Sequence, residues 1–171
     1  MKKIRSKDEI AATRAARKQG LIYLGIGGVV GLIMLWLATE FMLMNTIVLA
    51  ALAISGGMTA ARAAMLYRRE SASSAGSIGG MWAAFGFAIP FMAYFFYRFI
   101  TLTDADAIAR INAMPPDQQA AFRNGGFMLG PELITGEYVS YIFYYFLTAI
   151  ILGWLLGILG GALAKRRFAA A

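Results

Sequence analysis

Hydrophobic and polar positions follow one another along the chain in long blocks. Four apolar runs of about twenty residues or more are separated by stretches that hold most of the charges. A run of this length crosses a bilayer as a helix, whereas barrel strands are about ten residues long and alternate in polarity. The pattern predicts an all-α integral membrane bundle of four transmembrane helices. The expected spans are about 21–43, 46–67, 81–100 and 138–164.

The first block, residues 1–20, is a basic N-terminal segment. Ser6 and Glu9 have the spacing of a capping box, which predicts a short helix, and Gly20 has the character of a helix stop. The apolar run that follows is longer than the core of an ordinary signal peptide, and three more spans come after it. We therefore interpret it as a retained membrane anchor.

Residues 21–167 are interpreted as one membrane domain, followed by a C-terminal tail at 168–171. A tight turn is expected where Glu40 and Asn45 separate the first two spans. A Ser/Gly-rich linker is expected to end at residue 80, before the third span.

The only long connection is the loop 101–135, and it predicts two short helices. The second of them is expected to start at Pro115 and Pro116 and to stop at Gly125 and Gly126.

Basic residues are distributed unequally between the two sides that the four spans define. The side of the long loop carries only Arg98, Arg110 and Arg123 of the sixteen Lys and Arg residues. Because basic residues beside membrane spans stay in the cytoplasm, we expect both termini inside and the loop outside. The inner residues expected to contact anionic headgroups are Arg14, Arg17, Lys18, Arg68, Arg69, Lys165, Arg166 and Arg167.

Aromatic residues gather at the expected outer ends of spans three and four, in YFFYRF (94–99) and YVSYIFYYF (138–146). Tyrosine is enriched at membrane interfaces because its ring is apolar and its hydroxyl is polar. We interpret the tyrosines as an outer aromatic belt that also packs, with a pigment, a quinone or a partner bound by the last three as the alternative. They are Tyr94, Tyr97, Tyr138, Tyr141 and Tyr145.

Small residues recur at every fourth position on three of the spans, most regularly in GWLLGILGGALAKRR (153–167). On a helix they share one face, and their lack of bulk lets another helix approach closely. The chain lacks the G-x-x-x-x-G-K-[ST] pattern of a phosphate-binding loop. The face could close on the chain's own helices or on a foreign helix. The expected packing residues are Gly27, Gly31, Ala53, Gly57, Ala61, Ala149, Gly153, Gly157 and Gly161.

Composition limits the available chemistry. The chain has 171 residues, of which 15% are charged, and it contains neither Cys nor His. This excludes thiol chemistry and removes the commonest general base and the usual ligands of haem and zinc. We therefore expect no catalytic residue, no cofactor and no metal site. The net charge of +7 lies beside the spans, which indicates anionic phospholipids and not nucleic acid.

The stretch ISGGMTAARAAMLYRRESASSAGSIGGMWAAFGFAIPFMAYFFY (54–97) combines a small-residue span ending in arginines, a Gly-rich linker and an aromatic span. A loop with Pro and Gln and a final small-residue span with a basic tail follow. In this layout the chain resembles a family of small four-span bacterial inner-membrane proteins of unknown function. The resemblance implies a multi-pass protein of the bacterial inner membrane and transfers no site residues.

These features favour a non-catalytic structural or accessory subunit of a larger bacterial membrane complex of respiratory, photosynthetic or secretion type. It would act through helix packing and the outer loop, with other membrane protein subunits as partners. The alternative is a small homo-oligomeric channel or transporter. The lack of Asp or Glu in the middle of any span disfavours an ion-coupled pump. An enzyme acting on lipid would have only Glu40, Asp104 and Asp106 as candidate groups.

Overall fold

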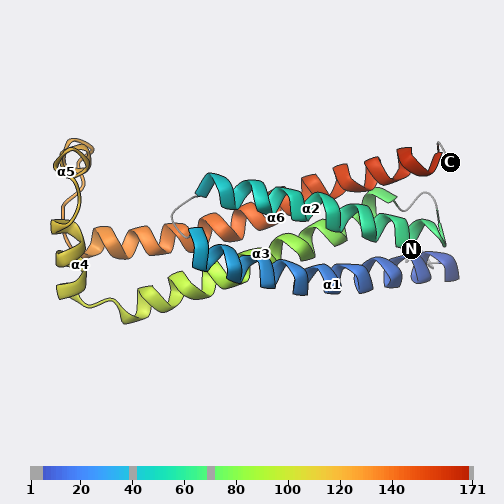
Figure 1. Ribbon diagram of the computed structural model, residues 1–171, viewed down its shortest axis with the longest axis horizontal. Coiled ribbons are helices and arrows are strands. Elements are labelled where there is room, and N and C mark those ends of the chain that lie inside the picture. The colour runs from blue at the N-terminus through green and yellow to red at the C-terminus, as the bar shows by residue number, and fades with distance from the viewer. Residues whose placement is uncertain (1–5, 39–41, 69–71, 170–171) are drawn as a thin grey trace, which may run out of the picture. The chain divides into compact units, whose positions relative to one another are not determined.

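The computed structural model describes residues 6–38, 42–68 and 72–169, and all regular structure in these ranges is helical. Four of the helices are long and apolar enough to cross a membrane (Figure 1), which confirms the expected all-α membrane bundle. The helices are α1 (Lys7–Ala38), α2 (Met42–Met65), α3 (Ala72–Thr101), α4 (Asp104–Asn112), α5 (Pro116–Asn124) and α6 (Pro131–Ala169).

α1 joins the basic N-terminal segment to the first span without a break. Its first turn is capped, because the backbone N–H of Glu9 donates to Oγ of Ser6 over 3.2 Å. The helix stop expected at Gly20 is wrong, since α1 continues to Ala38. A Cβ added at Gly20 would lie 2.5 Å from Cδ1 of Trp82 on α3. This glycine therefore marks a contact between helices and not the end of one.

The ends of the first three spans differ from the expected ones, since α1 ends at Ala38, α2 begins at Met42 and α3 begins at Ala72. Asn45, which we expected in a turn, is buried in the first turn of α2, while Glu40 lies outside the described residues. The prediction of a Ser/Gly-rich linker is also wrong over residues 72–80, because α3 already begins at Ala72. Glycine and serine are poor helix formers by themselves, so the packing of this stretch against other helices must supply its stability.

The long loop contains the two short helices that the sequence predicts. α4 starts with a complete capping box between Thr103 and Asp106, and α5 has Pro116 at its first position. α5 ends at Asn124 with Gly125 as its C-cap, and Gly126 follows with a φ of +80°, in the left-handed region that glycine adopts readily. Both predicted helices are confirmed.

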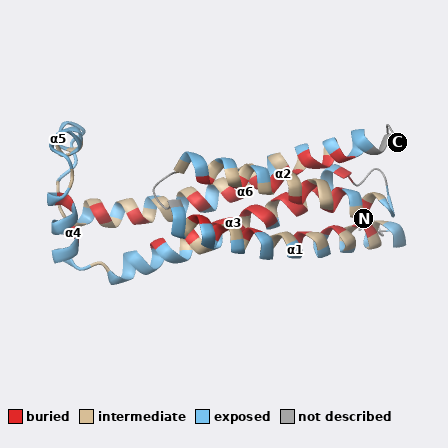
Figure 2. Ribbon diagram, in the orientation of Figure 1, coloured by how far each residue is buried: buried red, intermediate tan, exposed pale blue. Residues whose placement is uncertain are grey.

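The helices form two compact units, and α3 and α6 contribute to both. The four-helix unit contains α1, α2, the part of α3 up to Phe91 and the part of α6 from Phe146. The loop unit is Met92–Tyr145 and contains α4 and α5. In the four-helix unit, buried residues line the sides on which the helices face one another (Figure 2).

α6 is longer than a bilayer core is thick. Its 39 residues measure about 58 Å at a rise of about 1.5 Å per residue. The hydrocarbon core of a bilayer is about 30 Å thick. The apolar span expected from residue 138 is therefore only part of this helix, and we expect the remainder to extend beyond the hydrocarbon core.

Candidate functional site

The glycines of α6 pack against α3 of the same chain. A Cβ added at Gly157 would lie 2.6 Å from the backbone oxygen of Gly76 and 3.0 Å from Cα of Gly80. A Cβ added at Gly153 would lie 2.8 Å from Cβ of Ala84. Only hydrogen fits in these places, so the two backbones touch directly. We call this face the glycine seam, formed by Gly153, Gly157 and Gly161 on α6 and by Ala72, Gly76, Gly80 and Ala84 on α3.

The small residues of α1 and α2 also close on helices of the same chain. A Cβ added at Gly57 of α2 would lie 2.5 Å from the backbone oxygen of Gly157, so α2 meets α6 at the glycine seam. A Cβ added at Gly31 of α1 would lie 2.5 Å from the backbone oxygen of Phe87 on α3. All nine residues expected at a packing interface are buried: Gly27, Gly31, Ala53, Gly57, Ala61, Ala149, Gly153, Gly157 and Gly161.

A fourth small-residue face, which the sequence reading missed, lies on α3. It is regular, with a small buried residue at every fourth position from residue 72 to residue 88. Its first half falls in the Ser/Gly-rich stretch that composition marks as a linker, and this composition conceals the period. The period itself is the signal that identifies the face. Its members are Ala72, Gly76, Gly80, Ala84 and Ala88.

The loop unit has an aromatic core around Phe95. The ring centroids of Phe95 and Tyr141 are 4.6 Å apart in a stacked arrangement, and those of Tyr145 and Tyr138 are 6.1 and 6.3 Å from Phe95. Tyr138 and Tyr145 are 2% and 1% exposed, so they pack inside the protein and do not face lipid. Of the five tyrosines expected in the belt, Tyr94 and Tyr97 are exposed and Tyr141 is half-buried.

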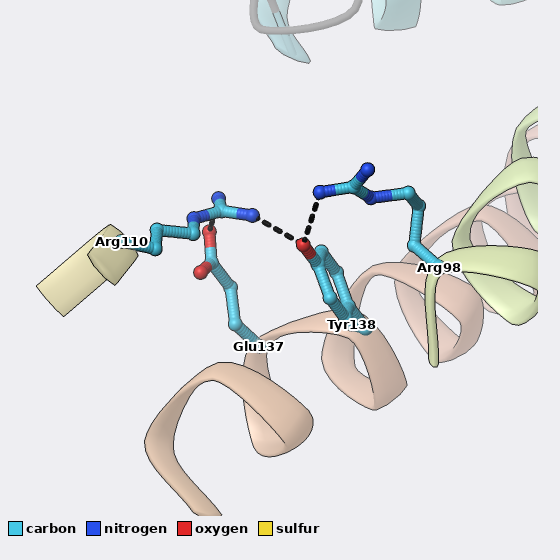
Figure 3. A network of polar contacts seen from close by, with 4 residues as sticks. All are labelled: Arg98, Arg110, Glu137 and Tyr138. Carbon is cyan, nitrogen blue, oxygen red and sulfur yellow. Dashed lines mark hydrogen bonds and ion pairs between the residues drawn. The ribbon is translucent and has the colours of Figure 1, made fainter. Parts of the chain in front are cut away.

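Two arginines converge on one of these tyrosines (Figure 3). Arg110 of α4 donates from Nη1 to Oη of Tyr138 over 2.6 Å and from Nη2 to Oε1 of Glu137 over 3.1 Å. Arg98 of α3 donates to the same Oη over 3.3 Å. Their Cζ atoms lie 5.2 and 5.9 Å from the centroid of the Tyr138 ring, within range of a cation–π attraction. We call these four residues the arginine–tyrosine node, and it connects α3, α4 and α6.

Sequence spacing gives no hint of the arginine–tyrosine node. Arg98 and Arg110 stood out only as basic residues on the expected outer side, and Glu137 as an acid near the start of a span. The partners are 28 and 40 residues apart along the chain. Only the tertiary packing of three helices brings them together.

Asp106, at the start of α4, has a lowered pKa. The Oγ1–H and the backbone N–H of Thr103 donate to Oδ2 of Asp106 over 2.6 and 3.4 Å. These bonds, the side-chain bond first, hold the pKa of Asp106 below its ordinary value of 3.8, and the positive charge of Arg98 lowers it further. Because the folded pKa is depressed, the capping box stabilises α4 above the ordinary pKa, and this stabilisation is lost as the pH falls through the folded pKa.

Replacing Thr103 by valine is expected to raise the pKa of Asp106 toward its ordinary value, because valine keeps the shape of threonine but cannot donate from its side chain. A carbon-13 NMR titration of the Asp106 carboxyl group measures the pKa directly. Thr101→Val is the matched control, since the Thr101 hydroxyl donates to the backbone oxygen of Tyr97. An Asp106 pKa that stays the same in Thr103→Val would contradict the assigned cause.

The basic residues expected at headgroups lie on the protein surface. Arg69 lies outside the described residues, and the other seven are exposed. Arg68 also pairs with Glu9, with Nη1 and Oε2 separated by 3.5 Å, so it ties the end of α2 to the start of α1. Within the described ranges, no group of three or more acidic side chains is placed to hold a metal ion, and this includes the acids of the loop.

Comparison of the chain with protein-family models, with curated proteins and with solved structures found no match. Three features of the chain bear on its function. They are a closed glycine-rich bundle, an aromatic core and a set of exposed groups on the loop unit.

Proposed function

We propose that this chain is a non-catalytic accessory subunit of a larger membrane protein complex in the bacterial inner membrane, with both termini in the cytoplasm. The orientation is supported by the excess of Lys and Arg on the side of the termini. The subunit acts by binding to other subunits of the complex. Its contact surface is not the set of small residues that the sequence favoured, because these are occupied by the chain's own helices.

The observation that carries the proposal is the exposure of α5 and of the residues after it. α5 has nine residues, none of them buried. Isolated helices shorter than about 12 residues are marginal in water, so α5 needs further contacts to be stable. Within the chain it is held by Gln119, whose Nε2 donates to the backbone oxygens of Ile111 and Met114 over 3.2 and 3.0 Å.

Two large apolar side chains follow α5 and face solvent. Phe127 is 59% exposed and Met128 is 86% exposed. The ring of Phe127 contacts the ring of Phe122 edge to face, with centroids 6.1 Å apart. Exposed aromatic residues and methionine are enriched in the centres of protein interfaces. A partner subunit that covers them would also supply the contacts that α5 lacks.

The polar groups of the spans support a role without ion transport. The hydroxyl of Thr59 donates to the backbone oxygens of Ser55 and Gly56 over 3.0 and 3.1 Å, and the hydroxyl of Ser55 donates to that of Leu52 over 3.1 Å. These groups are thus bonded to their own helix. A proton or ion path needs ionisable groups at depth, and the sequence has no Asp or Glu in the middle of a span.

Extraction of native membranes in a mild detergent is expected to yield this chain in a stoichiometric complex with unrelated membrane proteins, as seen by native electrophoresis and mass spectrometry. The double variant Phe127→Ser, Met128→Ser is expected to release the chain from that complex, because it removes the apolar contact and leaves the buried core intact. Val29→Ala is the control, since Val29 is as exposed as Phe127 but lies on α1 within a span. Thermal unfolding of each purified variant checks that the fold is retained.

One outcome would overturn the accessory-subunit proposal, and a second would overturn the contact surface at Phe127 and Met128. The first is a chain that purifies only with copies of itself and conducts ions in liposomes, which would establish the homo-oligomeric channel instead. The second is a complex that survives the double variant unchanged. This second result would show that the partner binds elsewhere on the chain.

A further inference from the structure

The arginine–tyrosine node places two positive charges close together. Nη2 of Arg98 and Nη1 of Arg110 both contact Oη of Tyr138, so these nitrogens lie no more than about 6 Å apart. Both guanidinium groups stay protonated at any physiological pH. Like charges at this distance repel each other, and a neutral phenol oxygen does not compensate them.

The acidic groups nearby compensate the pair only in part. Glu137 pairs with Arg110 over 3.1 Å. Arg98 forms no ion pair within the part of the chain that the structure describes. Asp106 lies near enough for the charge of Arg98 to lower its pKa, but its carboxylate is bonded to Thr103.

The two guanidinium groups are held in place and accessible. Each also lies within cation–π range of the ring of Tyr138, whose side chain is buried. The side chain of Arg110 is 41% exposed, and Arg98 is exposed. A guanidinium group has five N–H donors. Among the described residues, Arg98 uses one of these donors and Arg110 uses two. In Figure 3 the second terminal nitrogen of Arg98 points away from Tyr138.

The surroundings on α3 are those of a membrane interface. Arg98 lies in the last turn of an apolar helix that is long enough to span a membrane. Tyr94, one turn earlier on the same face, and Tyr97 have exposed rings. Tyrosine rings of this kind lie at the level of lipid headgroups. An anion bound by these arginines therefore lies at the level of the lipid headgroups. At this level, an anionic group that carries acyl chains can place those chains in the membrane.

We propose that Arg98 and Arg110 together bind the phosphate group of an anionic phospholipid, with Tyr94 beside its acyl chains. Arginine suits this role because its planar fork of N–H donors matches the oxygens of a phosphate, and two such forks can share one phosphate group. The lipid phosphate neutralises the charge of Arg98 and relieves the repulsion between the two arginines. This site is independent of the partner contact proposed for α5.

The test uses the full chain in a maltoside detergent, which carries no phosphate. Dioleoylphosphatidylglycerol is titrated in, and native mass spectrometry counts the lipids retained. Arg98→Gln and Arg110→Gln are each expected to weaken the binding of one lipid by about tenfold, because each removes charge-assisted bonds to the phosphate. Arg123→Gln is the matched control, since Arg123 is an outer arginine on α5 outside the arginine–tyrosine node, and it is expected to leave binding unchanged.

Two further probes identify the source of the phosphate. Dioleoylglycerol, which has the acyl chains without the phosphate, is expected not to bind at this site. Inorganic phosphate is expected to compete only weakly, because it lacks the chains. Inorganic phosphate that binds as tightly as the lipid would overturn the lipid assignment. A lipid affinity that does not depend on Arg98 and Arg110, or that falls equally in Arg123→Gln, would overturn the site.

Glu137→Gln provides a test in the opposite direction. Glu137 competes with the phosphate for Nη2 of Arg110, so its neutralisation is expected to tighten lipid binding several-fold. A damaged fold would weaken lipid binding, so tighter binding in this variant can come only from the loss of the competing carboxylate. The result therefore does not depend on whether the arginine variants fold. Unchanged or weaker binding in Glu137→Gln, with the unfolding temperature of the lipid-free protein retained, would contradict the proposed site.

Discussion

Replacing Gly157 by leucine is expected to lower the free energy of unfolding of the four-helix unit by about 3 kcal/mol or more. A Cβ at this position would lie 2.6 Å from the backbone oxygen of Gly76, and Gly57 of α2 approaches the same residue from another helix. Neither neighbour is a flexible side chain that can move aside. The helices must therefore separate, and every close backbone contact along the glycine seam is weakened.

Insertion into the membrane is expected to remain intact in Gly157→Leu, because leucine is more favourable in a membrane helix than glycine. Circular dichroism during titration with sodium dodecyl sulfate, in mixed micelles, measures the loss of stability. Gly136→Leu is the matched control on the same helix, since a Cβ at Gly136 meets no atom within 4 Å. That variant is expected to retain or slightly raise stability, because leucine forms helix better than glycine. Equal effects of the two substitutions would show that α6 does not pack through the glycine seam.

Phe95→Ala is expected to destabilise the loop unit by about 3 kcal/mol, in the range measured for large aromatic residues removed from cores. Phe95 is 5% exposed and lies between three tyrosines of α6, the nearest at 4.6 Å between ring centroids. Its removal leaves a cavity and ends the ring contacts that join α3 to α6 in this unit. Faster amide hydrogen exchange in residues 92–101 and 131–145, measured by mass spectrometry, is the expected signature.

Phe96→Ala is the control for this prediction, because Phe96 is the next residue on α3 and is 56% exposed. It loses the same number of atoms without opening a cavity. Hydrogen exchange in the loop unit is expected to change little. A similar acceleration in both variants would place the stability of the unit outside the aromatic core.

The four spans were predictable because each is a long apolar run, and the two loop helices because their ends carry strong local signals. Pro116 starts α5, Gly125 ends it, and Thr103 and Asp106 cap α4. Signals of this kind act between residues that are close along the chain. A sequence alone is sufficient to read them.

The errors at Gly20 and over residues 72–80 have one physical origin, which is that glycine both weakens an isolated helix and allows close packing of helices. Gly20 and the stretch 72–80 have the composition of a helix end and a linker, because glycine costs helix stability in an isolated chain. In the folded chain, Gly20 faces Trp82 and Gly76 faces α6. The gain from close backbone contact outweighs the low propensity, and composition by itself does not reveal which effect prevails.

The arginine–tyrosine node was beyond prediction for a different reason. Its members come from three helices, and Tyr138 is far from both arginines along the chain. Local patterns fix the helices but not the angles at which they meet. The positions of Arg98, Arg110 and Glu137 relative to one another therefore follow only from tertiary packing.

The composition of the glycine seam has a consequence for the entropy of folding. Glycine and alanine have no side-chain rotamers, so bringing α3, α2 and α6 together there immobilises no side chain. In a core of leucine or methionine, each buried side chain would lose rotamer freedom. The contacts of the glycine seam are thus made at a cost limited to the backbone, and the seam has no alternative rotamer packing through which it could loosen without separating the helices.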